Sequence, residues 1–151
     1  MTDPSQAASV LLKLYELRTE PALRQARAWF AFEFHPASAR DVLSTWLGPG
    51  HESAPYRMVT SYWDMAASLV TTGAIDADAF LAAHSEIFAT FSKVEPFLGE
   101  LRAAAGEPEF CKHIEAVISS APDRDAILAR RRAALLAAAK NQQAESSPPA
   151  A

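Results

Sequence analysis

The sequence predicts an all-α protein: a single-domain bundle of about six or seven helices around a central helix near residues 55–73. Half of the residues are hydrophobic and only five are glycine, a composition that favours helices over sheets. Apolar residues recur at intervals of three and four, and no segment shows the strict alternation typical of a strand. A length of 151 residues fits one domain with a real core.

The first two helices are expected at residues 5–18 and 21–34, with Pro21 at the start of the second. Apolar residues at helical spacing mark their inner faces: Val10, Leu11, Leu14 and Leu17, then Leu23, Ala26, Phe30 and Phe34. Two charges, Arg27 and Glu33, intrude on the second face, and buried charges are costly unless they are paired. Either Arg27 extends its guanidinium to water over an apolar stem, or it points inward.

A short third helix follows Pro36, which breaks the second. Ser38 with Asp41 three residues later forms a variant of the capping box. The Gly48–Gly50 segment ends this helix.

The central stretch, Pro55–Asp76, is where the local signals agree best. On a helical projection its apolar residues fall within an arc of roughly 160°: Met58, Val59, Tyr62, Trp63, Met65, Ala66, Leu69 and Val70. The other arc contains Ala67, Thr60 and the charged Arg57 and Asp64, and we expect these two charges at the surface.

The ends of the central helix are also marked. Ser53 is a possible N-cap, and Gly73 suits the left-handed position that follows a helix. Ile75 can pack back on the last turn, and Asp76 is a good N-cap for the next helix.

The remaining chain reads as further helices. Residues 77–105 carry one apolar stripe interrupted by Pro96, so a kink or a break is expected near Ser92–Glu95; one kinked helix and two helices both fit. Another helix should start at Pro108, and Ser120 with Asp123 should cap a last one running to about residue 140. The domain therefore spans residues 1–140, and the polar segment 141–151 is expected to be a disordered tail.

Composition excludes several classes of protein. A formal net charge of −4 argues against a general nucleic-acid binder, although it leaves room for a local basic patch. The single cysteine, Cys111, cannot form an internal disulfide, which fits a reducing cytoplasm. The N-terminus lacks the features of a signal peptide, and no apolar run is long enough to span a bilayer. We therefore expect a soluble cytoplasmic protein.

Three segments carry a family resemblance: LYELRTEPALRQARAWFAFEF, YWDMAASLVTTGAID and FSKVEPFLGELRAAAGEPEFCKHIEAV. Together they resemble an uncharacterised bacterial all-helical family, a domain of unknown function, over roughly residues 10–120. Many members of that family carry an N-terminal membrane anchor, whereas we expect this chain to begin directly with a soluble helix. Phe91 stands where the family pattern has Trp. The resemblance implies no catalytic residues.

Metal binding and nucleophilic catalysis have little support. Glu109 and His113 are four residues apart, but a metal needs three or four ligands, and such a pair equally makes an i,i+4 contact. Cys111 has Lys112 and His113 beside it, yet no catalytic motif frames it, and a semi-buried structural thiol is the usual outcome. We predict no metal and no cofactor, and the protein is more readily understood as a non-enzyme.

A ligand site is predicted around His84, which falls on an apolar stripe and can line a pocket with Tyr62 and Trp63. If Arg27 points inward, these four residues make an aromatic cavity with a cation, suited to a small anion. The alternative is that His84 is an ordinary core residue. A small-ligand-binding or sensory domain is therefore the second functional reading.

The first functional reading is a non-catalytic interaction or scaffold domain. The last helix has an apolar stripe that a protein partner or a second copy of the chain could bury: Ile127, Leu128, Leu135 and Leu136. Its Asp123, Asp125 and Arg130–Arg132 match the helix dipole and also fit a solvated face.

Overall fold

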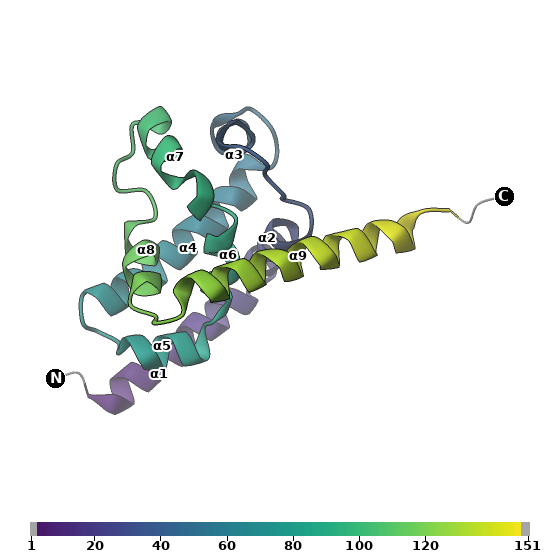
Figure 1. Cartoon of the computed structure of the whole chain (residues 1–151). Coiled ribbons are helices and arrows are strands. Elements are labelled where there is room, and N and C mark those ends of the chain that lie inside the picture. The colour runs from purple at the N-terminus through teal and green to yellow at the C-terminus, as the bar shows by residue number, and fades with distance from the viewer. Residues whose placement is uncertain (1–2, 149–151) are drawn as a thin grey trace.

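A computed structural model describes residues 3–148, and within this range the fold is all-α with no strand. The α-helices are α1 (Pro4–Thr19), α2 (Pro21–Phe32), α3 (Ala39–Leu47), α4 (Ser53–Thr71), α5 (Ala77–Ala83), α6 (Glu86–Ser92), α7 (Leu98–Ala105), α8 (Lys112–Ser119) and α9 (Arg124–Ser146), with a 3-10 helix, η1 (Glu95–Phe97), before α7. The described residues thus form more helices than the six or seven predicted, because the 77–105 segment divides into several short ones (Figure 1).

Helix α4 is central, as predicted, and packs against α2, α3 and α8. Its buried arc, however, is rotated relative to the predicted one: Thr60 and Ala67 are buried, whereas Met58 and Met65 are 37% and 42% exposed. The physical reason is that α8 covers the side of α4 that bears Thr60 and Ala67. The two methionines lie at the opposite edge of the buried arc of α4, where fewer side chains pack against them.

The predicted C-terminal corner of α4 is confirmed. Gly73 has φ 80°, and the backbone N–H groups of Ala74 and Ile75 both donate to the Leu69 carbonyl. The Ile75 side chain is buried, and the Asp76 carboxylate accepts a hydrogen bond from Ala79 N at 3.0 Å. These contacts fix the path of the chain from α4 into α5.

Two predicted caps need correction. Glu52, not Ser53, is the N-cap of α4, because the Ser53 hydroxyl donates instead to the Trp46 carbonyl at 2.7 Å. At the start of α9, Asp123 makes no capping hydrogen bond, and Ser120 donates to the Val117 carbonyl. The capping box of Ser38 and Asp41 at the start of α3 is confirmed.

The predicted break near Ser92–Glu95 is confirmed, since α6 ends at Ser92 and η1 contains Pro96. A further break at His84, where the backbone leaves helical geometry (φ −129°, ψ 42°), was not predicted. Helix α8 starts at Lys112, four residues later than expected, after Cys111 in a left-handed conformation (φ 57°).

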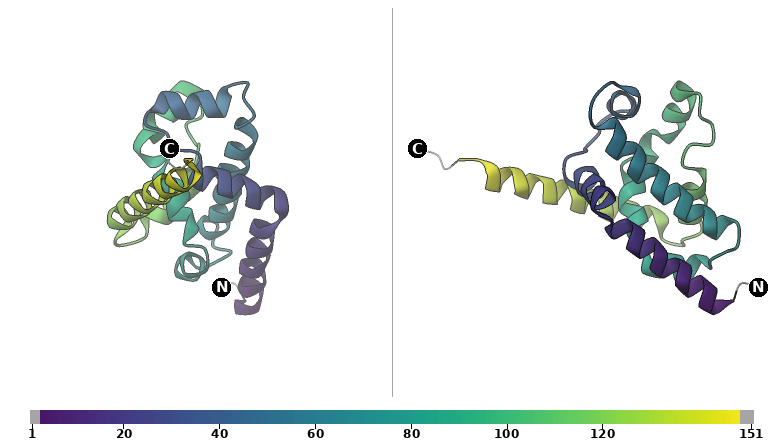
Figure 2. Two further views of the ribbon diagram at one scale, coloured as in Figure 1. Left: turned by 90° about the vertical axis from the view of Figure 1, so that its right-hand side faces the viewer. Right: turned by 180° about the vertical axis from the view of Figure 1, so that it is seen from behind.

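Helix α9 packs on α6 and α2, and its C-terminal half extends away from the other helices (Figures 1 and 2). It continues to Ser146, beyond the predicted end near residue 140, and all side chains from 140 to 148 are exposed. The first part of the predicted disordered tail is therefore helical, because its Gln, Ala and Glu residues sustain local helical hydrogen bonds without tertiary contacts. Residues 149–151 of that tail lie outside the described range.

Within residues 3–148, no helix is both long enough and apolar enough to cross a lipid bilayer.

Candidate functional site

The structure brings the predicted site residues together. Tyr62 and Trp63 lie on α4 with ring centroids 5.1 Å apart, and His84, at the end of α5, lies 6.3 Å from Trp63 in an edge-to-face arrangement. Arg27 reaches the same region from α2, where its positive charge acts on the Tyr62 hydroxyl. The prediction that these four side chains share one site is thus consistent with the fold.

The sequence did not indicate the ion-pair partner of Arg27, which is Glu86. Its Nε and Nη2 donate to Oε1 and Oε2 of Glu86 on α6, at 2.7 and 2.5 Å, and its Nη1 donates to the Arg18 carbonyl at 2.8 Å. Arg18 adds a second positive charge 3.6 Å from the same carboxylate. Arg27 therefore points inward but is fully paired, and a bidentate ion pair joins α2 to α6.

Tyr62 and His84 attach α1 to this cluster. The Tyr62 hydroxyl donates to the Leu14 carbonyl at 2.6 Å, and Nε2 of His84 lies 3.2 Å from the Leu11 carbonyl, which can only accept. Burial raises the pKa of Tyr62 to about 12 and lowers the pKa of His84, so both rings are neutral at pH 7.

Three buried nitrogen atoms in this cluster have no hydrogen-bond partner among residues 3–148: Arg18 Nε, Trp63 Nε1 and His84 Nδ1. The Arg18 guanidinium lies over the rings of Tyr15 and Trp63, at 5.1 and 5.9 Å from their centroids. The prominent cavities of the described chain are lined by other residues. The cluster is therefore densely packed and links α1, α2, α4 and α6, and its binding of a small anion stays a prediction.

A second buried cation, Lys93, was not singled out from the sequence. It is 6% exposed, and its Nζ donates to the carbonyls of Phe30, Ala31 and Phe34, at 2.6, 2.8 and 2.5 Å. These carbonyls belong to the C-terminal end of α2, where helical partners are lacking and positive charge is favourable. The only sequence signal was a single charge inside an apolar run, between Phe91 and Val94.

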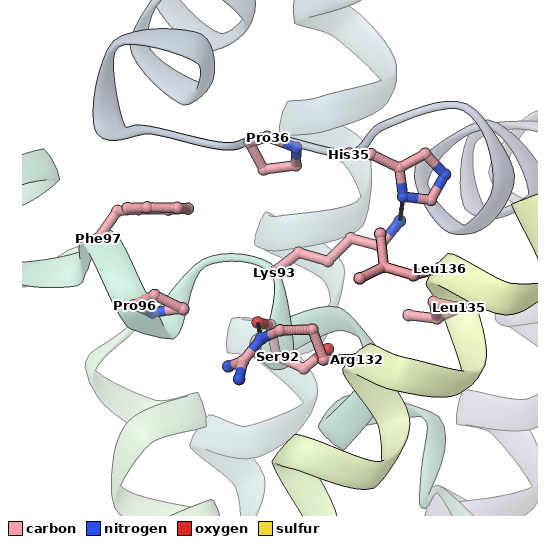
Figure 3. Close-up of a pocket in the computed structure, with 9 residues that line it drawn as sticks. All are labelled: His35, Pro36, Ser92, Lys93, Pro96, Phe97, Arg132, Leu135 and Leu136. Atoms are coloured by element: carbon pink, nitrogen blue, oxygen red, sulfur yellow. Dashed lines mark hydrogen bonds between the residues drawn. The ribbon is translucent and has the colours of Figure 1, made fainter.

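Lys93 lies beside a cavity of about 90 Å³ that α9 covers (Figure 3). Its walls are mostly apolar, with Pro36 before α3, Pro96 and Phe97 in η1, and Leu135 and Leu136 on α9. Nδ1 of His35 lies 3.5 Å from Lys93 Nζ, while its Nε2 lies 3.0 Å from the Phe32 carbonyl. The polar groups at the base of this cavity are thus occupied by internal hydrogen bonds.

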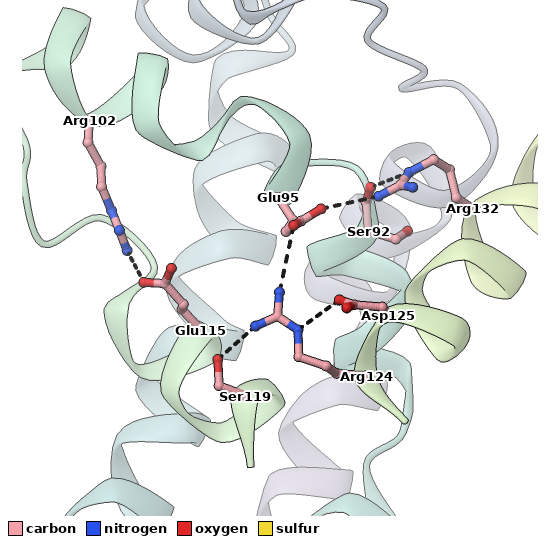
Figure 4. Close-up of polar contacts among 8 residues, drawn as sticks. All are labelled: Ser92, Glu95, Arg102, Glu115, Ser119, Arg124, Asp125 and Arg132. Carbon is pink, nitrogen blue, oxygen red and sulfur yellow. Dashed lines mark hydrogen bonds and ion pairs between the residues drawn. The ribbon is translucent and has the colours of Figure 1, made fainter. Parts of the chain in front are cut away.

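Ion pairs fasten α9 over this cavity (Figure 4). Glu95 lies between two arginines of α9, 3.7 Å from Arg124 and 3.4 Å from Arg132. Arg132 also donates from Nε to the Ser92 carbonyl at 2.9 Å, and Arg124 donates to the Ser119 hydroxyl at 2.9 Å. This attachment fixes one wall of the cavity.

The residues considered for metal binding and for nucleophilic catalysis make ordinary structural contacts. Glu109 pairs with Lys112, and Nδ1 of His113 contacts the Thr71 hydroxyl at 2.7 Å. No group of three potential metal ligands occurs within residues 3–148. Burial, helped by the Asp64 carboxylate, raises the pKa of the Cys111 thiol, so the thiol stays protonated and poorly nucleophilic.

Asp64, expected at the surface, instead caps α8 from a neighbouring helix. Its Oδ1 accepts hydrogen bonds from the backbone N–H groups of His113 and Ile114, at 3.0 and 3.1 Å. We expect Asp64→Ala to lower the free energy of unfolding by about 1 kcal/mol, measured by urea denaturation. Asp64→Asn, which keeps an acceptor oxygen, should lose less stability, and replacing the exposed Asp78 of α5 with alanine should change stability little. Equal losses for Asp64→Ala and Asp78→Ala would contradict the capping role.

A family model described as "Domain of unknown function (DUF4760)" matches residues 4–120. This match confirms the resemblance to an uncharacterised domain family. No curated protein and no solved structure matches the chain. Helix α9 begins after the matched region, so the cavity beside Lys93 lies between the family domain and a helix outside the match.

Proposed function

The chain belongs to the DUF4760 family, a domain of unknown function, and we propose that it is a non-catalytic interaction domain whose cavity beside α9 accepts one large apolar side chain of a protein partner. The observation that carries this proposal is the cavity itself, with its size and its apolar walls. Pockets for drug-sized ligands measure roughly 300–1,000 Å³. A volume of about 90 Å³ suits a single side chain.

The walls of the cavity favour an anchoring interaction. Pro36, Pro96 and Phe97 are rigid side chains that lose little entropy on binding, and burying one apolar side chain among them supplies about 1.5–3 kcal/mol. Leu136 is 45% exposed at the rim. Well-packed pockets filled by one anchor are typical of the residues that dominate protein interfaces.

The rim selects the charge of the partner. Arg132, Leu136 and Lys140 are spaced four residues apart, so they lie along one face of α9. None of the ion pairs within residues 3–148 includes Lys140. Lys140 adds a positive charge beside Leu136 that no ion pair offsets, whereas Arg132 is partly offset by Glu95. This row is complementary to a segment with acidic residues beside its apolar anchor.

Only part of the predicted apolar stripe of α9 is available to a partner. Leu128 is buried and Ile127 packs against the core of the same chain, and Leu135 lines the cavity. A partner is therefore expected to meet Leu136 and the cavity, and not the whole stripe. Catalysis has less support, because the charged groups in the Arg27 cluster and around the Lys93 cavity are paired with one another or with backbone groups.

The test is a titration followed by NMR, with a nine-residue probe peptide that carries a central leucine between glutamates. We expect shifts for residues around Phe97 and Leu136, and about tenfold weaker binding when alanine replaces the leucine of the peptide. Leu136→Glu should abolish binding, because it removes one wall and repels the glutamates. Leu12→Glu on α1, which is 71% exposed, is the matched control; equal binding by the leucine and alanine peptides, or by Leu136→Glu and Leu12→Glu, would overturn the proposal.

A further inference from the structure

The polar arc of α4, expected to face solvent, forms the floor of a cleft of about 350 Å³. Arg57, Thr60, Ser61 and Asp64 line the floor, and the 107–111 loop before α8 forms one wall. Trp46 of α3 and Phe110 of the loop close one side, with their rings stacked and their centroids 4.3 Å apart. The volume falls within the range typical of small-molecule sites.

Three of the four charged side chains that line this cleft form no ion pair within residues 3–148. None of the ion pairs within residues 3–148 includes Arg57, Asp64 or Glu107, whereas Glu109 pairs with Lys112. Arg57 makes one long hydrogen bond, from Nε to the Ser53 carbonyl at 3.4 Å. Its terminal nitrogens therefore remain available to a carboxylate, for which a guanidinium is a bidentate partner.

The other polar side chains of the cleft can accept hydrogen bonds from a ligand. The hydroxyls of Thr60 and Ser61 donate their hydrogens to carbonyls of their own helix, those of Tyr56 and Arg57, so their oxygen lone pairs are left for a donor. Asp64 uses Oδ1 to cap α8, and its Oδ2 makes no hydrogen bond or ion pair within residues 3–148. One cation and several acceptors thus share a single cleft.

We propose that this cleft binds a small α-amino acid of net positive charge. Arg57 takes the carboxylate, and Asp64 and Glu107 take the ammonium and the cationic side chain. The aromatic rings of Trp46 and Phe110 cover the aliphatic part and attract the cation. An excess of unpaired acidic over basic groups in the cleft favours a ligand with one positive charge more than a neutral zwitterion.

The probes that test this proposal are L-arginine, agmatine, which lacks the carboxylate, and L-citrulline, which lacks the side-chain charge. We expect calorimetry to show that L-arginine binds about tenfold more tightly than either analogue, since each analogue loses one charge pair. The NMR signals of Trp46 and Phe110 should shift during the titration. No binding of L-arginine, or equal binding of L-arginine and agmatine, would overturn the proposal.

Two variants test which side chain of the cleft binds which charged group of the ligand. Arg57→Gln should abolish the preference for L-arginine over agmatine, and Glu107→Gln should narrow the preference for L-arginine over L-citrulline. Both side chains are exposed, so the fold is expected to tolerate these changes. Glu100→Gln, an exposed change on α7, is the matched control. An Arg57→Gln variant that keeps the wild-type preference contradicts the assignment of the carboxylate to Arg57.

Discussion

Replacing Lys93 with methionine is expected to lower the free energy of unfolding by about 3 kcal/mol, which corresponds to a fall in melting temperature of roughly 10 °C. The substitution keeps much of the apolar stem but removes the N–H donors of the amine. The carbonyls of Phe30, Ala31 and Phe34 then lose their shared partner, Nζ, at the end of α2. Buried acceptors without partners cost about 1–3 kcal/mol each, and partial hydration offsets some of that loss.

The effect should depend on pH. Burial lowers the pKa of Lys93 to about 7 from 10.5, while the three carbonyls favour its charged form. Between these two values the unfolded chain binds the proton more tightly than the folded chain, so stability rises with pH in this window and falls as the pH is lowered through it. The stability difference between wild type and Lys93→Met is therefore expected to increase from pH 7 to pH 10.

Lys112→Met is the matched control, because Lys112 is exposed and its ion-pair partner within residues 3–148 is the exposed Glu109. We expect it to change stability by less than about 0.5 kcal/mol. Chemical denaturation of the wild type, Lys93→Met and Lys112→Met at several pH values measures these differences in stability. Similar losses for both lysines would show that Lys93 does not cap α2.

Replacing Arg27 with leucine is expected to lower the free energy of unfolding by about 2 kcal/mol. The side chains of Arg27 and Glu86 are 19% and 33% exposed, which places this pair between exposed ion pairs, worth up to about 1 kcal/mol, and buried ones, whose disruption costs about 3–5 kcal/mol. Arg18 remains near Glu86 and limits the loss. This result would assign Arg27 a structural role, in contrast to a ligand contact that can be removed without effect on the fold.

Arg24→Leu, one turn earlier on the exposed side of α2, is the control for Arg27→Leu and should be nearly neutral. Glu86→Gln and the double variant Arg27→Leu/Glu86→Gln complete a double-mutant cycle, in which urea denaturation measures the free energy of unfolding of each protein. A coupling energy near zero between Arg27 and Glu86 would contradict the pairing.

Local signals predicted the features that depend on a few consecutive residues. The glycine at position 73 with Asp76 after it, and Ser38 with Asp41, fix the backbone through neighbours in the chain, so their geometry follows from the sequence. The break beside Pro96 has the same origin. The extra break at His84 has no glycine or proline to mark it, and therefore the helix count was too low.

The residues that complete each site come from distant parts of the chain. Glu86 lies 59 positions from Arg27, and Lys93 lies 59–63 positions from its three carbonyls. No spacing rule connects such pairs. The polar arc of α4 was assigned to solvent for a related reason, because the periodicity of one helix says nothing about the loop that covers it.

The exposed end of α9 has a consequence for stability measurements that follow helix content. Its last described turns are held by hydrogen bonds within the helix itself. They should therefore lose helicity gradually on heating, like an isolated peptide, while the packed helices melt in one cooperative step. Far-ultraviolet circular dichroism will therefore show a sloping baseline before the main transition, and a two-state fit to it will understate the enthalpy. Tryptophan fluorescence reports the cooperative step without that contribution, because Trp29, Trp46 and Trp63 lie in the packed helices α2, α3 and α4.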